Sequence, residues 1–174
     1  TICYHAQNNV IETHVQLNSI TTKYEKVEKI FLTIEEIEKI EKKQFEHDYL
    51  TNARDWLIIS CETGQRVSDF MRFNKKQIRF EGKVPLIEFT QVKTNKTMAI
   101  PLSKRVIAIL EKRNGEFPRQ ISDQRYNEYI KDVCKLVELN QKTKGSIQKT
   151  EDKVTRKESG TFEKWELVTS HIGR

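Results

Sequence analysis

One strongly apolar helix constrains the fold of this chain more than any other feature. The segment from about Tyr49 to Thr63 has helical spacing, and apolar side chains fall on nearly every side of it (Ala53, Trp56, Leu57, Ile58, Ile59 and Cys61). A helix that is apolar all round has to lie in the centre of a domain. Gly64 follows, and glycine commonly ends a helix in the left-handed conformation. At 174 residues, we therefore predict one domain packed around this helix.

Arg66 lies two residues beyond Gly64, and the short segment after it is suited to start another helix. A guanidinium group is always charged and carries a planar set of donors, so it is costly to hold at the end of a buried helix without an anion nearby. The sequence leaves two anions open. One is the carboxylate of Asp69, in a structural ion pair, which is the commoner arrangement. The other is a phosphate group of a ligand.

Three short segments with alternating apolar residues come next. They are Ile78 to Phe80, Leu86 to Val92 and Thr97 to Leu102, joined by Glu81-Gly82-Lys83 and by a tip of Lys93-Thr94-Asn95-Lys96. Prolines are tolerated near strand ends, where Pro85 and Pro101 fall. The pattern predicts a three-stranded antiparallel meander.

Capping residues mark helices on both sides of the predicted sheet. Thr33 and Glu36 match a capping box, and Ser103 and Ser122 each precede apolar residues at helical spacing. We expect one face of the first helix to be lined by Ile34, Ile37 and Ile40. The fold class predicted from these elements is α+β, mainly helical, with a small three-stranded antiparallel sheet.

The segment from Gln141 to Gly160 is nearly free of apolar residues and rich in basic ones (Lys142, Lys144, Lys149, Lys153, Arg156 and Lys157). We interpret it as a basic excursion from the domain, either mobile or hairpin-like. The chain is expected to return to the core through Phe162, Trp165, Leu167 and Val168. It then reaches Thr169-Ser170-His171-Ile172-Gly173-Arg174.

The composition favours an acidic partner and a reducing compartment. A formal net charge of +6 suits a polyanion, although charges of both signs at this density usually form only a solvated surface. The three cysteines, Cys3, Cys61 and Cys134, lack the spacing of a zinc site or of a disulfide framework. Neither a membrane span nor a signal peptide is indicated, so we expect a cytoplasmic location.

Four further basic residues are placed where they can bind an anion, and each also has an ordinary explanation. Lys93 and Lys96 lie at the predicted hairpin tip, where lysines commonly serve only to solubilise a turn. His171 and Arg174 are three residues apart, so on a helical turn they share a face and can reach one ligand. Neither pair is specific by itself.

Together, these segments resemble the catalytic domain of tyrosine recombinases, the phage integrase family. The resemblance rests on the order and spacing of Thr63 to Phe70, of Lys93-Thr94 before Ile100-Pro101-Leu102, and of Thr169 to Arg174. The opening Phe31-Leu32-Thr33 and the Lys164-Trp165-Glu166-Leu167 segment are most similar to integrases of Bacteroides-type mobile elements, such as transposons. The resemblance implies that residues 31–174 have the tyrosine-recombinase catalytic-domain fold. It also implies that this catalytic domain is incomplete at its C-terminal end. Residues 1–30 are then expected to be the end of a core-binding domain and the interdomain linker.

The family implies site-specific DNA recombination and integration through a 3′-phosphotyrosine intermediate, with no metal, ATP or other cofactor. By resemblance, Arg66 and Arg174 clamp the non-bridging phosphate oxygens, where bidentate contacts neutralise developing charge. His171 assists proton transfer and holds the phosphate. Lys93 protonates the leaving 5′-oxygen, and Asp69 has a supporting role. The implied partners are double-stranded DNA and further copies of the full-length protein, in a tetrameric recombination complex, and no membrane.

The chain departs from the family at one position. The nucleophilic tyrosine of the family follows the His-x-x-Arg sequence, and the given sequence stops at Arg174. None of its tyrosines matches that place (Tyr4, Tyr24, Tyr49, Tyr126 and Tyr129), and the last two are expected to be core residues. We therefore expect this chain to bind DNA phosphate without cleaving in cis, and to expose apolar surface that promotes self-association. The alternative is a non-catalytic DNA-binding or regulatory protein on an integrase scaffold.

Overall fold

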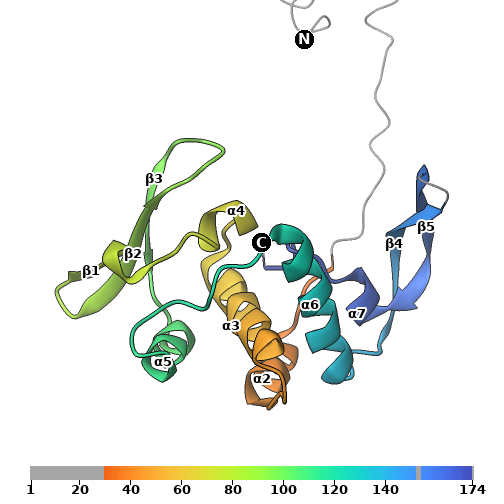
Figure 1. Ribbon diagram of the computed structural model, residues 1–174, viewed down its shortest axis with the longest axis horizontal. Helices are drawn as coiled ribbons and strands as arrows, with labels where there is room; N and C mark the ends of the chain where they lie inside the picture. The colour runs from red at the N-terminus through yellow and green to blue at the C-terminus, as the bar shows by residue number, and fades with distance from the viewer. Residues whose placement is uncertain (1–29, 152–153, 174) are drawn as a thin grey trace, which may run out of the picture.

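The structure is a computed structural model that describes residues 30–151 and 154–173, without the side chains of residues 149–155. Helices form the centre of the molecule, and an antiparallel sheet lies at each end (Figure 1). The predicted linker at residues 1–30 lies outside the described part except for Ile30, and so does Cys3. In chain order, the elements are α2 (Ile34–Lys42), α3 (Asp48–Thr63), α4 (Val67–Phe70), η2 (Lys75–Gln77), β1 (Ile78–Glu81), β2 (Val84–Thr90), β3 (Thr97–Pro101), α5 (Lys104–Lys112), α6 (Asp123–Leu136), β4 (Lys142–Glu151), β5 (Val154–Glu163) and α7 (Lys164–Leu167).

Helix α3 is the buried centre of the fold, as its composition predicts. Its apolar residues from Ala53 to Ile59 are at most 1% exposed. Gly64 ends the helix in the left-handed conformation, with φ of 64°, and its N–H donates to the Ser60 carbonyl. Helices α5 and α6 pack on α3, and α6 lies antiparallel to it (Figure 1). The α+β fold with a small three-stranded sheet is therefore confirmed.

Several polar side chains of α3 are buried, and residues of neighbouring segments supply their hydrogen bonds and ion pairs. Asp55 receives two hydrogen bonds from Arg54, at 2.9 and 2.8 Å, and a charged contact from Arg113 at the end of α5. Asn52 binds both the N–H and the carbonyl of Arg119, each at 2.8 Å. These contacts fix the segment between α5 and α6 against the central helix.

Helix α2 begins with the predicted capping box. The Thr33 hydroxyl accepts from the Glu36 N–H, and the Glu36 carboxylate accepts from the Thr33 N–H at 2.7 Å. The same carboxylate accepts two hydrogen bonds, at 2.7 and 2.6 Å, from Lys164, which is only 6% exposed. The prediction that Ile34, Ile37 and Ile40 line one face of this helix is wrong in part, because Ile40 is buried while Ile34 is 65% exposed. Steps of three residues drift by about 60° each around a helix, so Ile34 turns away from the core.

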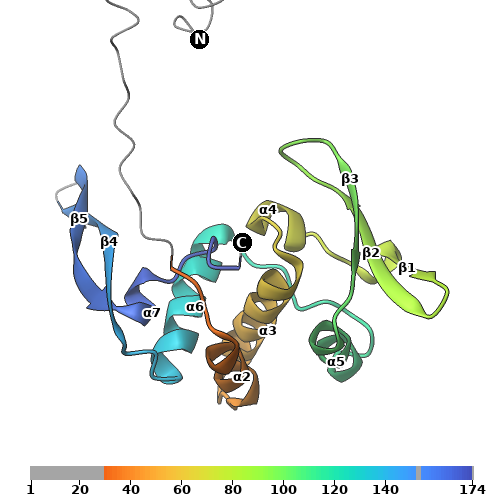
Figure 2. The same ribbon diagram turned by 180° about the vertical axis from the view of Figure 1, so that it is seen from behind.

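The three-stranded sheet has the order β1-β2-β3, and both pairings are antiparallel. Ile87 and Phe89 of β2 belong to the buried core, whereas Phe80 on β1 is exposed. The loop between β2 and β3 projects to the same side of the molecule as α4, the top in both views (Figures 1 and 2). The meander thus carries the predicted lysine tip to the end of the central helix.

The basic excursion is a long antiparallel hairpin, so the hairpin-like interpretation is confirmed. Strands β4 and β5 pair in register from Lys142 with Glu163 to Glu151 with Val154. Helix α7 packs against the base of this hairpin: a Cβ atom on Gly145 would lie 2.7 Å from the Leu167 side chain. The hairpin lies at the opposite end of the helical body from the three-stranded sheet (Figure 2).

Candidate functional site

Arg66 occupies the turn between α3 and α4. It is the N-cap residue of α4 with an extended backbone, and its carbonyl accepts from the N–H groups of Asp69 and Phe70. Its side chain is half-buried, and its guanidinium group makes no hydrogen bond or ion pair to another described residue. A partly desolvated cation with free donors favours binding an anion that approaches from outside.

Asp69 does not pair with Arg66, so the structural ion pair left open by the sequence is wrong. The Asp69 carboxylate is 3% exposed, and its Oδ1 accepts from the N–H of Val92 at 2.8 Å. Its Oδ2 has no hydrogen-bond partner among the described residues. Asp69 therefore ties α4 to the segment that follows β2.

Lys93 and Lys96 are exposed on the loop that joins β2 to β3. Backbone hydrogen bonds close the loop, from Gln91 N–H to the Lys96 carbonyl and from Asn95 N–H to the Gln91 carbonyl, each at 2.9 Å. Asn95 adopts the left-handed conformation with φ of 52°, which asparagine tolerates. The amide of Gln91 also donates to the amide oxygen of Gln65, next to Arg66, at 2.9 Å.

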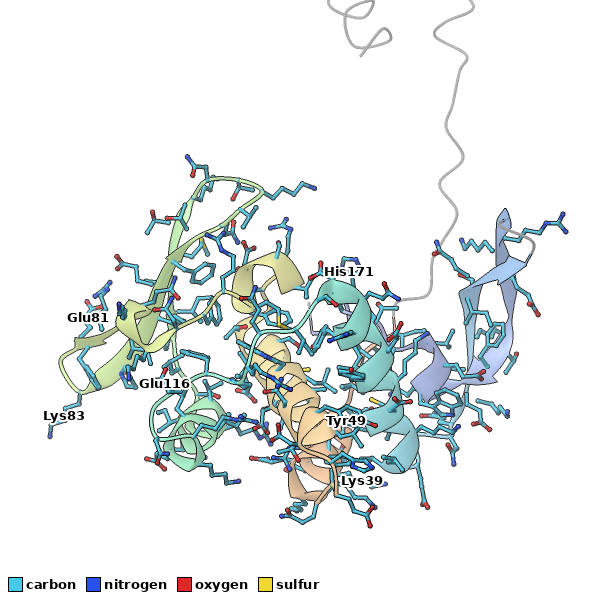
Figure 3. All side chains as sticks on the ribbon, in the orientation of Figure 1. Lys39, Tyr49, Glu81, Lys83, Glu116 and His171 are labelled. Carbon is cyan, nitrogen blue, oxygen red and sulfur yellow. The ribbon has the colours of Figure 1, made fainter. Side chains whose placement is uncertain are left out.

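His171 is exposed on a turn after α7, beside the N-terminal end of α6 (Figure 3). The turn is closed by a hydrogen bond from Ile172 N–H to the Thr169 carbonyl at 3.0 Å, and Ile172 is buried. Asn127 of α6 accepts from the Ser170 N–H at 2.7 Å. The histidine is thus presented to solvent by a turn that is anchored on both sides. Arg174 lies outside the described residues.

Two glycines bring the arginine and histidine segments together. A Cβ atom on Gly64 would lie 3.9 Å from the carbonyl oxygen of Gly173. A Cβ atom on Gly173 would lie 2.6 to 2.8 Å from three atoms of Ser60, two of them backbone. Such close approach requires glycine. The Arg66 turn, the lysine loop and the His171 turn therefore lie on the same side of the helical body, at the top in Figure 1.

The described tyrosines do not lie in this cluster as free nucleophiles. Tyr126 is fully buried, and burial raises the pKa of its hydroxyl, which donates to Ser60 Oγ at 3.3 Å. Tyr129 is half-buried and contacts Tyr49, with ring centroids 4.7 Å apart. These two rings line a cavity of about 670 Å³ together with Arg119 and Arg125. The expected core role is confirmed for Tyr126, and Tyr129 lies at the edge of the core. Tyr4 and Tyr24 lie outside the described residues.

Sequence reasoning missed Gln65, Gln91 and Asn127, which hold the candidate site together through neutral amides. Gln65 stands within the Thr63 to Phe70 segment, but an amide carries no charge, and nothing local in the sequence indicates which partner it binds. Within residues 30–151 and 154–173, no three His, Cys, Asp or Glu side chains gather as a metal-binding group. Over the same residues, every helix is too short or too polar to cross a lipid bilayer.

Comparisons with known proteins agree with the geometry. The profile described as "Phage integrase family" matches residues 21–160, a span that contains Arg66, Asp69 and Lys93 and ends before His171. No curated protein matches the chain. The fold is similar to that of the XerH site-specific recombinase, crystallised with its difH substrate in a pre-cleavage complex, with a TM-score of 0.51 and 16% identity over 74% of this chain. The matched region spans 43% of the XerH chain.

The profile match covers most of the sequence and includes two of the three segments assembled at the candidate site. We conclude that the chain belongs to the phage integrase family.

Proposed function

We propose that this chain is the catalytic domain of a tyrosine recombinase that integrates a mobile element of the Bacteroides type by site-specific breakage and rejoining of DNA. The observation that carries the proposal is that the three separate segments bearing Arg66, Lys93 and His171 lie on the same side of the helical body. The half-buried guanidinium of Arg66 pairs with no described residue and is suited to a phosphate. The family and the XerH fold support the same assignment.

In the proposed reaction, a tyrosine oxygen attacks a DNA phosphorus atom, and the bond from phosphorus to the 5′-oxygen breaks. Arg66 and Arg174 neutralise the non-bridging oxygens as charge develops on them. His171 assists removal of the tyrosine proton and holds the phosphate, and the Lys93 ammonium gives a proton to the leaving 5′-oxygen. The products are a 3′-phosphotyrosine and a free 5′-hydroxyl, and the reverse reaction with a new 5′-hydroxyl rejoins the strand. Asp69 supports the site by holding the N–H of Val92.

We propose further that the nucleophile comes from outside residues 1–174 and that the intact protein works as a tetramer on double-stranded DNA. The 174-residue chain is then inactive in cis and binds DNA mainly through phosphates. Neutralising each phosphate releases condensed counterions, so the affinity should fall steeply as salt rises.

The binding part of the proposal is tested by measuring DNA affinity over a series of salt concentrations with a short fluorescent duplex. Removing one phosphate contact by Arg66→Ala should lower the slope of log affinity against log salt by about one. Arg79→Ala is the matched control, because Arg79 is exposed on β1 and already paired with Glu88 at 2.6 Å. Thermal unfolding of both variants shows whether they fold. Equal slopes for two folded variants would contradict the role of Arg66.

A second candidate function is a DNA-binding or regulatory protein without turnover. The observation in its favour is that no tyrosine among the described residues lies at the site as a free nucleophile. A nicked suicide duplex carrying the element's attachment site distinguishes the two, because loss of the short 5′-hydroxyl strand traps any covalent intermediate. An adduct formed by the intact gene product, and not by the 174-residue chain, supports the recombinase. No adduct with either protein supports the regulatory function.

A further inference from the structure

We propose that Gln65 and Gln91 are positioning residues, which hold the lysine loop against the Arg66 turn so that Lys93 is directed at the leaving oxygen. The inference rests on the proposed function and extends it to residues that make no contact with the reacting atoms. It is carried by a continuous set of hydrogen bonds that joins the end of α3 to the residue after Lys93.

The hydrogen bonds run in one direction through the two amides. The Thr94 hydroxyl donates to Gln91 Oε1 at 2.6 Å. Gln91 Nε2 donates to Gln65 Oε1 at 2.9 Å. Gln65 Nε2 donates to the Thr63 carbonyl, in the last turn of the central helix, at 3.0 Å. Each amide therefore uses its oxygen as acceptor and its nitrogen as donor, an arrangement that fixes the orientation of both side chains.

Lys93 is held on both sides by this arrangement. The residue before it, Val92, donates its N–H to the buried carboxylate of Asp69. The residue after it, Thr94, is the first donor of the amide set. Lys93 itself is exposed, and its ammonium group has no partner among the described residues. The backbone of an otherwise free lysine is thus fastened to the same turn that carries Arg66.

This fastening has a chemical consequence. A lysine on a free loop spends much of its time away from the leaving oxygen, because four rotatable bonds and the mobile backbone multiply its conformations. Fixing the backbone on both sides of Lys93 reduces the time that its ammonium group spends away from the leaving oxygen. The rate of proton donation rises as a result. Disrupting the amides should therefore slow only the step that needs the Lys93 proton.

The first measurement tests the hydrogen bonds in the 174-residue chain itself. Amide hydrogen exchange followed by NMR reports on Asn95, whose N–H donates within the loop. Gln65→Leu and Gln91→Leu should each lower its protection by roughly 10-fold, the size expected from one lost hydrogen bond. Gln44→Leu is the matched control, because Gln44 is exposed and far from the loop in sequence. Unchanged protection in both loop variants would overturn the inference.

The second measurement uses the intact gene product and two DNA substrates. One is ordinary DNA, and the other carries sulfur at the bridging 5′ position, since a thiolate leaves without needing a proton. On ordinary DNA, Lys93→Ala should cleave roughly 100-fold more slowly, and Gln65→Leu and Gln91→Leu roughly 10-fold more slowly. On the sulfur substrate, all three should cleave within about two-fold of the wild type.

The outcomes separate the inference from the function on which it rests. An equal loss on both substrates for the glutamine variants, with the lysine variant rescued by sulfur, overturns the positioning role and leaves the recombinase intact. If the wild type cleaves neither substrate, the proposed function fails, while the exchange data still decide whether the amides hold the loop. The conservative variant Thr94→Val, which removes only the hydroxyl donor, should behave as a milder form of Gln91→Leu.

Discussion

Replacing Gly173 by alanine should destabilise the domain, although only one methyl group is added. The new Cβ atom would lie 2.6 Å from Ser60 Oγ, 2.7 Å from Ser60 C and 2.8 Å from Ser60 O. Carbon atoms in contact prefer about 3.5 to 4.0 Å, so the two segments have to separate by about 1 Å. Two of the three atoms are backbone of the buried helix α3, which cannot rotate away as a side chain can.

Overpacking of this kind typically costs about 1–3 kcal/mol. For a domain of this size, 1 kcal/mol lowers Tm by about 2–4 °C, so a cost of about 2 kcal/mol gives a fall of about 4–8 °C. The same displacement moves the His171 turn away from the Arg66 turn. DNA affinity should therefore fall together with stability.

Urea and thermal unfolding of the 174-residue chain measure the effect directly. Gly160→Ala is the matched control: the nearest atom to its Cβ would be 3.4 Å away on the ring of Phe162, and the expected change is within about 0.5 kcal/mol. Adding Ser60→Ala to Gly173→Ala should not restore stability, because the two backbone contacts persist. A Gly173→Ala variant as stable as the wild type would refute the close packing of the two segments.

Three further predictions concern stability. Lys164→Met should cost about 3–5 kcal/mol in urea unfolding, since it leaves the largely buried Glu36 carboxylate unpaired. Tyr126→Phe should cost only about 1 kcal/mol by the same assay, because one hydrogen bond of 3.3 Å is lost. Burial raises the pKa of Cys61 from 9.0 to about 11 and that of Cys134 to about 12. Above pH 9 the thiols of the unfolded chain lose their protons while the buried thiols keep theirs, so the unfolded state becomes more favourable as pH rises. Tm should therefore fall as pH rises from 9 towards 11 or 12, and a Tm that is unchanged over this window would contradict the burial of the thiols.

The elements that depend on local chemistry could be predicted from the sequence. The apolar surface of α3, the left-handed Gly64 and the Thr33 capping box each follow from the residue types in one short segment, and the structure confirms all three. The three-stranded meander is also local, because each strand pairs with the next along the chain. The hairpin from β4 to β5 follows the same rule.

Contacts between distant segments could not be predicted in the same way. Arg66 is only three residues from Asp69 in the sequence, yet the Asp69 carboxylate accepts a hydrogen bond from the N–H of Val92. This choice of partner depends on how the sheet packs on the helices. The bond from Gln91 to Gln65 spans 26 positions between uncharged residues. The position of Ile34 depends on the rotation of α2, which is fixed by contacts with distant residues such as Arg105 and Lys164.

The ion pair of Lys164 with Glu36 has a consequence for the order of folding during synthesis. The two residues are 128 positions apart, and the pair joins the first described helix to the last. At about 5–20 residues per second, roughly 6–26 s separate the appearance of the carboxylate from that of its partner. During this interval, Glu36 remains hydrated, and α2 is held by its own capping box, by its contacts with α3 and by the ion pairs of Glu38 and Glu41 with Arg105 of α5. The amino-terminal helix of the domain therefore reaches its final packing only after the α7 segment has left the ribosome.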